Sequence, residues 1–346
     1  MKAVQLVEAG RLEIVDTEIP GIGDRDVLLK VAAAGLCHSD VHVRHMSESL
    51  FAAPTTLGHE TAGHVVQIGS EVTGWSIGDS ALVHLIWACG VCGACARGDD
   101  NVCHESGRIA MPTTPGLGPH GGMAEYMAVP ARHLVPLGGL DPVSAAPLAD
   151  AGMTPYHAIR NSAHVLRPGA TAVVIGIGGL GHLAVQIIAA LTTARVVAVD
   201  LSDARLDGAR RHGAHEVLHA DSATAASILE LTAGRGAEAV FDFVGNQDTV
   251  ELAANAVAPD GVYQLVGIGG GQVPVGAAPR FGVGWPWGAS VRTSYGGTKS
   301  DLLGCVALAH SGQLTVDVET FALDDALTAF DRLEQGSITG RAVLIP

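Results

Sequence analysis

Four of the six cysteines in this chain of 346 residues lie in one short stretch, between positions 89 and 103. They are separated by two, two and seven residues, and the set is Cys89, Cys92, Cys95 and Cys103. Thiolates with such short spacers can converge on one tetrahedral zinc ion at about 2.3 Å, and the glycines between them permit the necessary turns. Because four protein ligands leave no open position, this zinc would be structural.

The same cysteines could instead form two disulfides, remain unrelated thiols or hold an iron–sulfur cluster. The start of the chain has no secretory signal, so we expect a cytoplasmic protein whose thiols stay reduced, which disfavours disulfides. The seven-residue gap and the lack of a proline after Cys103 disfavour an iron–sulfur cluster. The loop at 87–103 has few large apolar residues, so a metal ion would stabilise it in place of a core.

Two further residues of metal-ligating type lie in glycine-marked turns nearer the start of the chain. Cys37 is part of GLCHSDVH, and His59 is part of GHE. Taken singly, each is weak evidence, because a lone cysteine is more often a small core residue and a lone histidine is more often structural. These residue types alone leave both alternatives open.

A glycine-rich turn lies near the middle of the chain. TAVVI at 171–175 predicts a strand, GIGGLG follows at 176–181, and the apolar spacing of HLAVQIIAAL predicts a helix. RVVAVD at 195–200 predicts the next strand. In a chain with 45 glycines a chance match is a real alternative, but this one lies between a strand and a helix, as a dinucleotide-binding turn requires.

The positions within this turn suit a dinucleotide. Gly176 permits the turn, Gly178 lets backbone amides approach a pyrophosphate, and Gly181 allows the helix to pack closely on the strand. Gly179 and Leu180 complete the loop. We therefore assign all five residues to cofactor binding.

Asp200 ends the second of these strands at about the spacing expected of a ribose-binding acid. Its carboxylate would accept hydrogen bonds from the adenosine ribose and repel a 2′-phosphate, so we predict NAD(H) rather than NADP(H). Arg205 leaves NADP(H) as the alternative cofactor, because a nearby guanidinium would favour a 2′-phosphate unless it flanks the adenine.

The surrounding pattern predicts an α/β protein with two domains. AVFDFVG at 239–245 and VYQLVGIGG at 262–270 predict two more strands with a helix between them. Strands that alternate with helices form a parallel sheet, whose carboxyl edge holds the ligand. The first 150 residues or so lack this alternation and are rich in short strand candidates with Gly and Pro turns. The length also favours two domains.

Composition excludes several classes of function. The net charge is -15 and no basic run exceeds two residues, so nucleic acid and an anionic membrane surface would be repelled. No apolar run approaches the roughly 18 residues of a membrane span. With 48% hydrophobic residues a sizeable core is expected. We predict a small-molecule substrate as the partner.

Along its whole length the chain resembles the zinc-dependent alcohol dehydrogenases of the medium-chain dehydrogenase/reductase family. The stretches that carry the resemblance are GLCHSD, GHETAGHVVQIGSEV, the cysteine loop, GIGGLG and GRAVLIP. LADAGMTPYHAI and SYGGTKSDL are most similar to bacterial secondary-alcohol and aryl-aldehyde reducing enzymes. The resemblance implies a GroES-like β-rich catalytic domain at 1–153 and 288–346, and a Rossmann domain that binds NAD(H) at 154–287. It also implies reversible oxidation of an alcohol, with one catalytic and one structural zinc per subunit.

The resemblance implies that Cys37, His59 and Asp150 hold the catalytic zinc, with Asp150 where many relatives have a second cysteine. It implies that Glu60 is a nearby carboxylate able to exchange with water at the metal. Asp40 is implied to orient the ring of His59 by accepting its other N–H. The alternative for both acids is an ordinary surface charge.

The resemblance also assigns residues to proton transfer and to the cofactor. Ser39 is implied as a relay hydroxyl and His42 as the terminal base, with an ordinary surface histidine as the alternative. His38 is implied to face the pyrophosphate. The other implied cofactor contacts, for which core packing is the alternative at the two apolar positions, are Val244, Ile268 and Arg341.

Four aromatic residues are candidates for the walls of an apolar substrate pocket, with core or interface packing as the alternative: Phe51, Trp87, Trp285 and Tyr295. Such walls would favour secondary or aryl-substituted alcohols, and a polyol is the alternative substrate.

Two other classes of protein are alternatives to this reading. A zinc-free quinone or enoyl reductase would lack Cys37, His59 and the cysteine loop. A zinc-module binding protein is the non-enzyme alternative. We expect a tetramer, with a dimer as the alternative.

Overall fold

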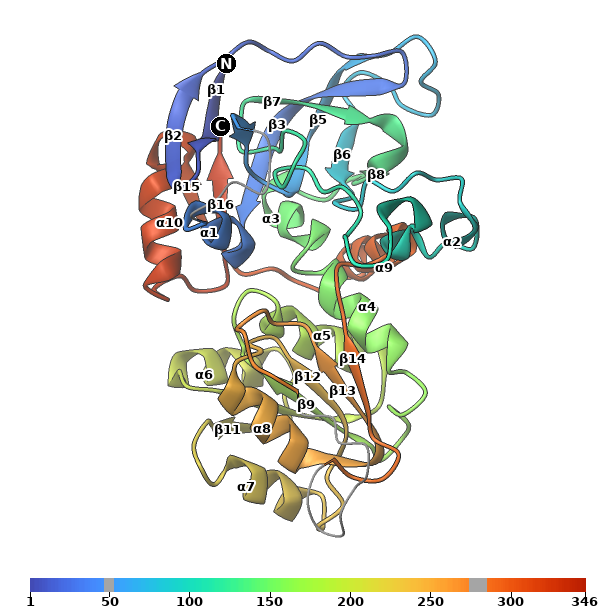
Figure 1. Cartoon of the computed structure of the whole chain (residues 1–346), viewed down its shortest axis with the longest axis vertical. Coiled ribbons are helices and arrows are strands. Elements are labelled where there is room, and N and C mark those ends of the chain that lie inside the picture. Colours follow the sequence, from blue (N-terminus) through green and yellow to red (C-terminus); the bar gives the residue numbers. More distant parts are fainter. Residues whose placement is uncertain (47–52, 274–284) are drawn as a thin grey trace. The chain divides into compact units, whose positions relative to one another are not determined.

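The structure is a computed structural model that describes residues 1–46, 53–273 and 285–346. The chain forms two compact units, the first made of residues 1–153 and 296–346 and the second of residues 154–295 (Figure 1). The second crossing therefore lies beyond residue 288, because residues 290–293 form the last strand of the second unit's sheet. Among the helices of the described ranges, none is long and apolar enough to span a membrane.

The first unit is built mainly of strands. Their bounds are β1 (Lys2–Glu8), β2 (Arg11–Asp16), β3 (Asp26–Leu36), β4 (Thr55–Thr56), β5 (Glu60–Ile68), β6 (Ser80–Val83), β7 (Tyr126–Pro130), β8 (Leu134–Pro136), β15 (Val318–Ala322) and β16 (Arg341–Ile345). One sheet has the order β2-β1-β4. The larger sheet has the order β15-β16-β3-β5-β6-β8, with β7 also paired to β3.

Strand β3 lies at the centre of the larger sheet and carries the apolar run VLLKVAAAGL, most of which is buried. Its last residues pair with the first residues of two other strands. Gly35 lies opposite Glu60 of β5, and Leu36 lies opposite Ala342 of β16. Three segments that are distant in sequence therefore meet at one point, which is where Cys37, His59 and Arg341 lie.

Helices of the first unit are short. They are α1 (His38–Arg44), α2 (Gly93–Ala96), α3 (Pro142–Ala145), α9 (Lys299–His310) and α10 (Ala326–Glu334), with 3-10 turns η1 (Asp100–Val102), η2 (His104–Ser106), η3 (Ala131–His133), η4 (Ala146–Ala149) and η5 (Leu323–Asp325). One apolar core lies between β1, β16 and α10, with Phe330 fully buried in it. A second core lies among β3, β5, β6 and β7.

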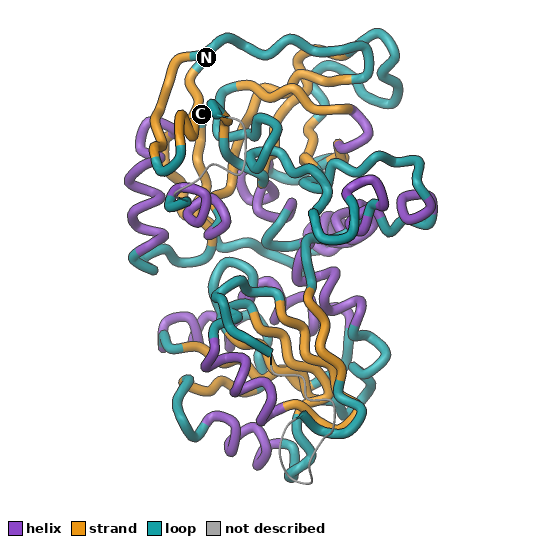
Figure 2. The backbone as a smooth tube through the Cα atoms, viewed as in Figure 1, coloured by secondary structure: helices purple, strands orange, loops and turns teal. Residues whose placement is uncertain are grey.

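The second unit is a parallel sheet flanked by helices (Figure 2). The strands are β9 (Thr171–Ile175), β10 (Arg195–Asp200), β11 (Glu216–His219), β12 (Ala237–Asp242), β13 (Val257–Leu265) and β14 (Ser290–Thr293). The helices are α4 (Met153–Asn161), α5 (Gly181–Leu191), α6 (Asp203–Arg211), α7 (Thr224–Leu231) and α8 (Gln247–Ala256). The strand order is β11-β10-β9-β12-β13-β14, which is the doubly wound order of dinucleotide-binding domains.

The predicted strands at 171–175 and 195–200 are confirmed with the same bounds. The predictions for the next two strands extend too far toward the C-terminus, since β12 ends at Asp242 and β13 at Leu265. The chain turns at Asp242, whose Oδ1 accepts hydrogen bonds from the amides of Val244 and Gly245 at 2.9 Å each. Residues after these strands form loops at the carboxyl edge of the sheet.

Candidate active site

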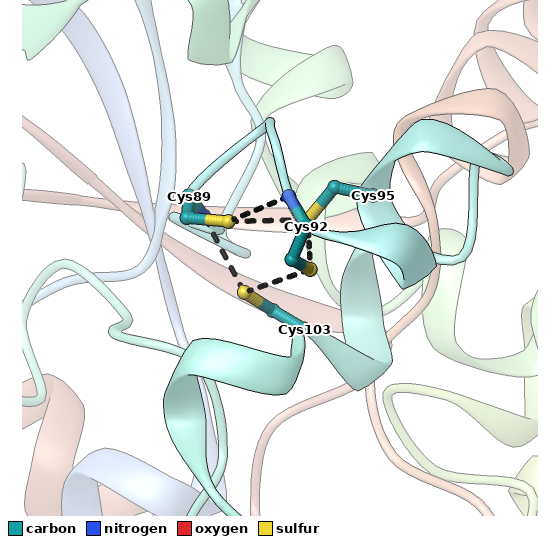
Figure 3. A group of neighbouring side chains, drawn as sticks. All are labelled: Cys89, Cys92, Cys95 and Cys103. Carbon is teal, nitrogen blue, oxygen red and sulfur yellow. Dashed lines mark hydrogen bonds between the residues drawn. The ribbon is translucent and has the colours of Figure 1, made fainter.

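The four cysteines of the 89–103 loop point toward one another (Figure 3). Their Sγ atoms are 3.5 Å apart for Cys92 and Cys95, and 3.9 Å apart for Cys89 and Cys95 and for Cys92 and Cys103. A tetrahedron of sulfurs around zinc has edges of about 3.8 Å, whereas a disulfide joins its sulfurs at about 2 Å. The spacing fits a zinc ion and excludes disulfides, and every cysteine of the described structure is free.

Backbone amides donate to these sulfurs. The amide of Cys92 lies 3.3 Å from Cys89 Sγ, and the amide of His104 lies 3.4 Å from Cys92 Sγ. Hydrogen bonds from the backbone at Cys95 and His104 lower the pKa of Cys92 to about 6. Donors that favour the thiolate prepare the sulfurs for a cation, and a closed set of four sulfurs suits a structural ion.

The cysteine loop is attached to the rest of the first unit by polar contacts that the sequence did not reveal. The carboxylate of Asp100 accepts hydrogen bonds from the amide of Lys299 at 3.2 and 3.3 Å, at the start of α9. Arg132 donates to the carbonyl of Ala88 at 3.2 Å. His84 Nδ1 lies 3.8 Å from Asp100 Oδ2. No motif in the sequence connects these residues, because the contacts join distant segments.

A second set of ligand atoms gathers at the ends of the central strands. Cys37, His59 and Asp150 each offer one atom, and these atoms lie within 4.8 Å of one another. Asp150 Oδ2 is 3.4 Å from Cys37 Sγ and 3.6 Å from His59 Nε2. Ligands of one tetrahedral zinc would lie about 3.4 to 3.6 Å apart, so the three residues fit a metal with three protein ligands.

Each member of this cluster is placed by the end of a regular element. Cys37 follows β3 and begins α1, His59 directly precedes β5, and Asp150 directly follows η4. Cys37 and His59 are buried, so solvent is largely kept from their ligand atoms. The ligand atoms therefore meet although their residues come from separate elements, which is compatible with a metal site made by all three.

Asp40 lies beneath the cluster and is 0% exposed, so the surface-charge alternative does not hold for it. Its Oδ2 accepts a hydrogen bond from the amide of Cys37 at 2.9 Å, and its Oδ1 lies 3.5 Å from His59 Nδ1. Burial would lower the pKa of His59, but the carboxylates of Asp40 and Asp150 raise it well above 6.5. The surrounding acids therefore favour a positive charge where a metal would bind.

Glu60 is also 0% exposed, and its carboxylate forms a two-pronged ion pair with Arg341. The distances are 2.9 Å from Arg341 Nε to Oε2 and 2.6 Å from Nη2 to Oε1. Arg341 Nη2 also lies 3.6 Å from Asp150 Oδ2. Sequence analysis missed this pair. The predicted contact of Arg341 with the pyrophosphate stays a prediction.

Helix α1 carries the residues expected to transfer the proton. Ser39 Oγ lies 3.6 Å from Cys37 Sγ, so this hydroxyl borders the ligand cluster. His38 and His42 are exposed on the same helix. The relay role of Ser39 and His42 and the pyrophosphate contact of His38 stay predictions.

In the second unit, the GIGGLG turn joins β9 to α5. Gly176 has a φ of 85°, which favours glycine, and a Cβ on Gly181 would lie 1.9 Å from the carbonyl oxygen of Gly176. A Cβ on Gly178 would meet nothing within 4 Å, so the backbone there is open to a ligand. These three positions have the geometry that their predicted roles require.

Asp200 is fixed by backbone donors at the carboxyl edge of the sheet. Its Oδ2 accepts the amide of Ile177 at 2.7 Å, and its Oδ1 accepts the amide of Ser202 at 2.9 Å. Arg205 Nη1 lies 3.9 Å from the same Oδ1. A carboxylate oxygen has more than one lone pair, so each can still accept a ribose hydroxyl.

Val244 and Ile268 lie in the two loops that follow β12 and β13. Ile268 is 66% exposed and Val244 is 37% exposed, so neither is a core residue. The loops are joined through their backbones, with the amide of Gly269 3.0 Å from the carbonyl of Val244. The contact of both residues with nicotinamide stays a prediction.

Of the aromatic candidates in the described ranges, Trp87 belongs to the first unit, and Trp285 and Tyr295 belong to the second. Trp87 stacks on His133 with ring centroids 5.7 Å apart, and Trp285 stacks on Tyr263 at 5.5 Å. Packing therefore accounts for these two tryptophans, and their role as pocket walls stays a prediction, as does that of Tyr295. Phe51 lies outside the described residues.

Two family models match parts of the chain. Residues 23–139 match the alcohol dehydrogenase GroES-like domain, and residues 179–311 match the zinc-binding dehydrogenase domain. The chain belongs to the zinc-dependent alcohol dehydrogenase family. A zinc-dependent alcohol dehydrogenase has GroES-like and Rossmann-type domains, as this chain does, and is an oxidoreductase. Membership excludes the zinc-module binding protein that the cysteine loop alone allows.

Several members of the family cover the whole chain. An NAD-dependent alcohol dehydrogenase of Sulfurisphaera tokodaii is 37% identical, over 100% of both chains. A D-arabinose 1-dehydrogenase (NADP(+)) of Saccharolobus solfataricus is 35% identical, over 97% of this chain and 94% of that one. The crystal structure of the alcohol dehydrogenase from Aeropyrum pernix has a TM-score of 0.90 and 36% identity, covering 100% of both chains.

Proposed function

We propose that this zinc-dependent alcohol dehydrogenase uses NAD(H) to interconvert secondary or aryl-substituted alcohols and the corresponding ketones or aldehydes. The observation that carries the proposal is the convergence of the buried Cys37 and His59 with the half-buried Asp150, whose ligand atoms lie within 4.8 Å of one another. A set of three protein ligands leaves a position for substrate, which distinguishes catalytic zinc sites from structural ones.

Cys37, His59 and Asp150 are the residues that would hold the catalytic ion. When bound there, zinc would supply the Lewis acidity that polarises a substrate oxygen and favours loss of a hydroxyl proton. Asp40 Oδ2 accepts the amide of Cys37, and its Oδ1 lies 3.5 Å from His59 Nδ1, where a small shift would let it accept the ring N–H. One buried acid would then orient two ligands.

The proton released in alcohol oxidation has a route along α1. Ser39 borders the ligand cluster, and His42 lies three residues later on the exposed part of the helix. Residues three apart share a helix face, so a hydroxyl and an imidazole can act in sequence, together with the cofactor ribose. His42, an exposed imidazole, would pass the proton to water.

NAD(H) is the proposed cofactor because of Asp200. Its carboxylate is held by two backbone amides at the edge of the sheet, where an adenosine ribose would lie. A 2′-phosphate at that position would face a fixed negative charge. Arg205 Nη1 lies 3.9 Å from Asp200 Oδ1, and this contact partly satisfies a cation that could favour NADP(H).

The substrate class and the assembly are the less specific parts of the proposal. The arabinose dehydrogenase relative makes a sugar or polyol the second candidate substrate. We retain a tetramer in the cytoplasm as the expected state. A gel-filtration measurement of mass tests the tetramer.

A substrate panel tests the proposed function. Purified protein is assayed with NADH and NADPH on aryl ketones, aliphatic ketones, aldehydes and a sugar lactone, before and after chelation, while zinc content is measured. We expect reduction of ketones with NADH, two zinc ions per subunit, and loss of activity on chelation. A preference for NADPH would contradict the cofactor assignment, and activity without zinc would contradict the metal assignment.

A further inference from the structure

Asp242 is a buried acid at the carboxyl end of β12 that the proposed chemistry does not use. The residue is 0% exposed, and its carboxylate accepts three hydrogen bonds. Oδ1 accepts from the amides of Val244 and Gly245, and Oδ2 accepts from the hydroxyl of Tyr263, at 2.9 Å in each case. Burial and the charge of Asp242 raise the pKa of Tyr263, so this phenol stays protonated and remains a donor. One side chain therefore connects the loop after β12 to strand β13.

The backbone carbonyl of Asp242 holds the loop that follows β13. It accepts hydrogen bonds from the amides of Val266 and Gly267, at 3.0 and 2.9 Å. The side chain of this residue thus fixes the first loop, and its main chain fixes the second. Both loops lie at the carboxyl edge of the parallel sheet, where ligands of doubly wound folds bind.

The two loops also contact each other directly, with glycines at the joint. The amide of Gly269 lies 3.0 Å from the carbonyl oxygen of Val244, and the amide of Gly271 lies 2.8 Å from that of Gly245. A Cβ on Gly269 would lie 2.7 Å from the same oxygen of Val244, and a Cβ on Gly267 would lie 2.3 Å from the Val244 carbonyl carbon. Gly267 and Gly269 are not among the glycines with positive φ, so the close approach is what requires them.

The place of these loops in the sheet indicates which part of a dinucleotide they would face. The pyrophosphate turn follows β9 and Asp200 ends β10, so the adenosine half would lie over those two strands. A doubly wound sheet has two mononucleotide-binding halves, and β12 and β13 belong to the other one. The loops after them expose Val244 and Ile268, two apolar side chains that a nicotinamide ring would cover.

We propose that Asp242 is a positioning residue for the nicotinamide half of NAD(H). The inference rests on the proposed function, because it matters only if the second unit binds this cofactor. Being fully buried, the carboxylate acts through the two loops, which it holds in one arrangement before the cofactor arrives. Without it, two amides and a phenol lose their acceptor, and the loops leave that arrangement. The apparent affinity then falls with the fraction of molecules that stays competent to bind.

Binding of NADH and of ADP-ribose tests this role, because ADP-ribose contains the adenosine and pyrophosphate but lacks the nicotinamide. Fluorescence titration gives the dissociation constant of NADH, and calorimetry gives that of ADP-ribose. We expect Asp242→Ala to weaken NADH by roughly tenfold and ADP-ribose by less than about twofold. The change in nicotinamide fluorescence on binding, which reports the surroundings of the ring, should also be smaller.

Two matched variants separate positioning from a general disturbance of the sheet. Glu238 lies on the same strand and its carboxylate also accepts a backbone amide, that of Thr171 at 2.7 Å, but at the amino end of the strand. Glu238→Ala should lower the melting temperature and leave the preference for NADH over ADP-ribose unchanged. Asp242→Asn keeps an oxygen for the two loop amides, and its amide group can donate to the hydroxyl of Tyr263. This variant should keep most of the wild-type affinity for NADH.

The variant Gly269→Ala decides the question should Asp242→Ala fail to fold. Its methyl group separates the two loops and leaves the carboxylate in place, so the same selective loss of NADH binding is expected. Wild-type NADH binding in Asp242→Ala or, in its place, Gly269→Ala would overturn the inference and leave the proposed function standing. Equal weakening of both ligands, or the full loss in Asp242→Asn, would do the same. A wild-type protein that binds neither ligand would overturn the inference and the proposed function together.

Discussion

The two candidate metal clusters of the first unit collect their ligands in opposite ways. The cysteine loop takes four thiols from one stretch, Cys89 to Cys103, with little regular structure around them. The other cluster takes Cys37, His59 and Asp150 from the ends of separate elements. Four cysteines would fill the coordination sphere of a zinc ion in the loop. The second cluster offers only three protein ligands, beside the buried carboxylates of Asp40 and Glu60.

The two clusters should therefore have different roles, one in the stability of the fold and the other in the reaction. The loop depends on its metal for shape, since its own residues form little core. The buried cluster depends on the sheet for its shape, because the pairing of Gly35 with Glu60 and of Leu36 with Ala342 fixes the strand ends before any metal binds. Loss of the metal should therefore unfold the cysteine loop, whereas at Cys37, His59 and Asp150 it should abolish activity and leave the sheet folded.

Removing a ligand from the buried cluster should have the largest effect. We expect Cys37→Ser to lower kcat/KM by roughly 10³-fold or more, because the catalytic metal is lost or misplaced. Zinc content should fall from two to one per subunit while the melting temperature changes little. Cys305→Ser, which removes another buried thiol, is the control and should keep both metals. A Cys37→Ser variant with wild-type kcat/KM would contradict the assignment.

Removing a ligand from the cysteine loop should reverse this pattern. Cys103→Ser should lose the structural ion and lower the melting temperature by on the order of 10 °C, since metal binding is folding energy for such a loop. The folded fraction should keep most of its kcat/KM at low temperature. Calorimetry together with metal analysis provides the check. An unchanged melting temperature after loss of the metal would remove the structural role.

A smaller effect is expected from Asp40, which we propose orients the ligands without binding the metal. Asp40→Asn should weaken zinc binding at the buried cluster by about 10- to 100-fold, as is usual for carboxylates that support a metal-bound histidine. Competition with a chromogenic chelator measures this change. Asp79→Asn, at a surface turn, is the control. Equal zinc affinity in the two variants would show that Asp40 has no part in the site.

The smallest effect concerns acid stability around the cysteine loop. Burial, helped by the charge of Lys299, lowers the pKa of His84 to about 4, although the hydrogen bond with Gly297 and the charge of Asp301 oppose the shift. Because the folded pKa is below the unfolded value near 6.5, the unfolded state binds more protons as the pH falls below 6.5. Stability is then lost, by about 1 kcal/mol between pH 7 and pH 5.5 for this one residue.

Urea unfolding of wild type and His84→Gln at several pH values measures that loss. The glutamine can still donate to the carbonyl of Gly297, which His84 Nε2 contacts at 3.2 Å, but it does not titrate. We expect the variant to lose less stability than wild type on acidification. Parallel curves for the two proteins would exclude a contribution from His84.

Local patterns were enough to predict some of this architecture. The cysteine spacing predicted a compact thiol cluster, because short spacers and glycines act within one loop. The strand, turn and helix from 171 to 191 were predicted with nearly correct bounds, since apolar periodicity and a glycine-marked turn coincide there. Both signals arise from residues that are neighbours in sequence.

The buried cluster could not be derived in this way. Asp150 entered only through resemblance to a family, because nothing near it in sequence indicates a ligand. The pair of Glu60 with Arg341 was missed, since 281 positions separate the partners and only the sheet brings them together. Strand ends were also misplaced after Asp242, where a carboxylate turns the chain by binding two amides.

The most direct test is the alcohol oxidation rate of protein whose Cys37 cluster is free of metal. Mild chelation should strip this site while zinc-edge anomalous diffraction shows the cysteine loop still occupied. We predict that oxidation with NAD falls in proportion to zinc lost from Cys37, His59 and Asp150, and returns when zinc is restored. Full activity with that cluster empty would contradict the account.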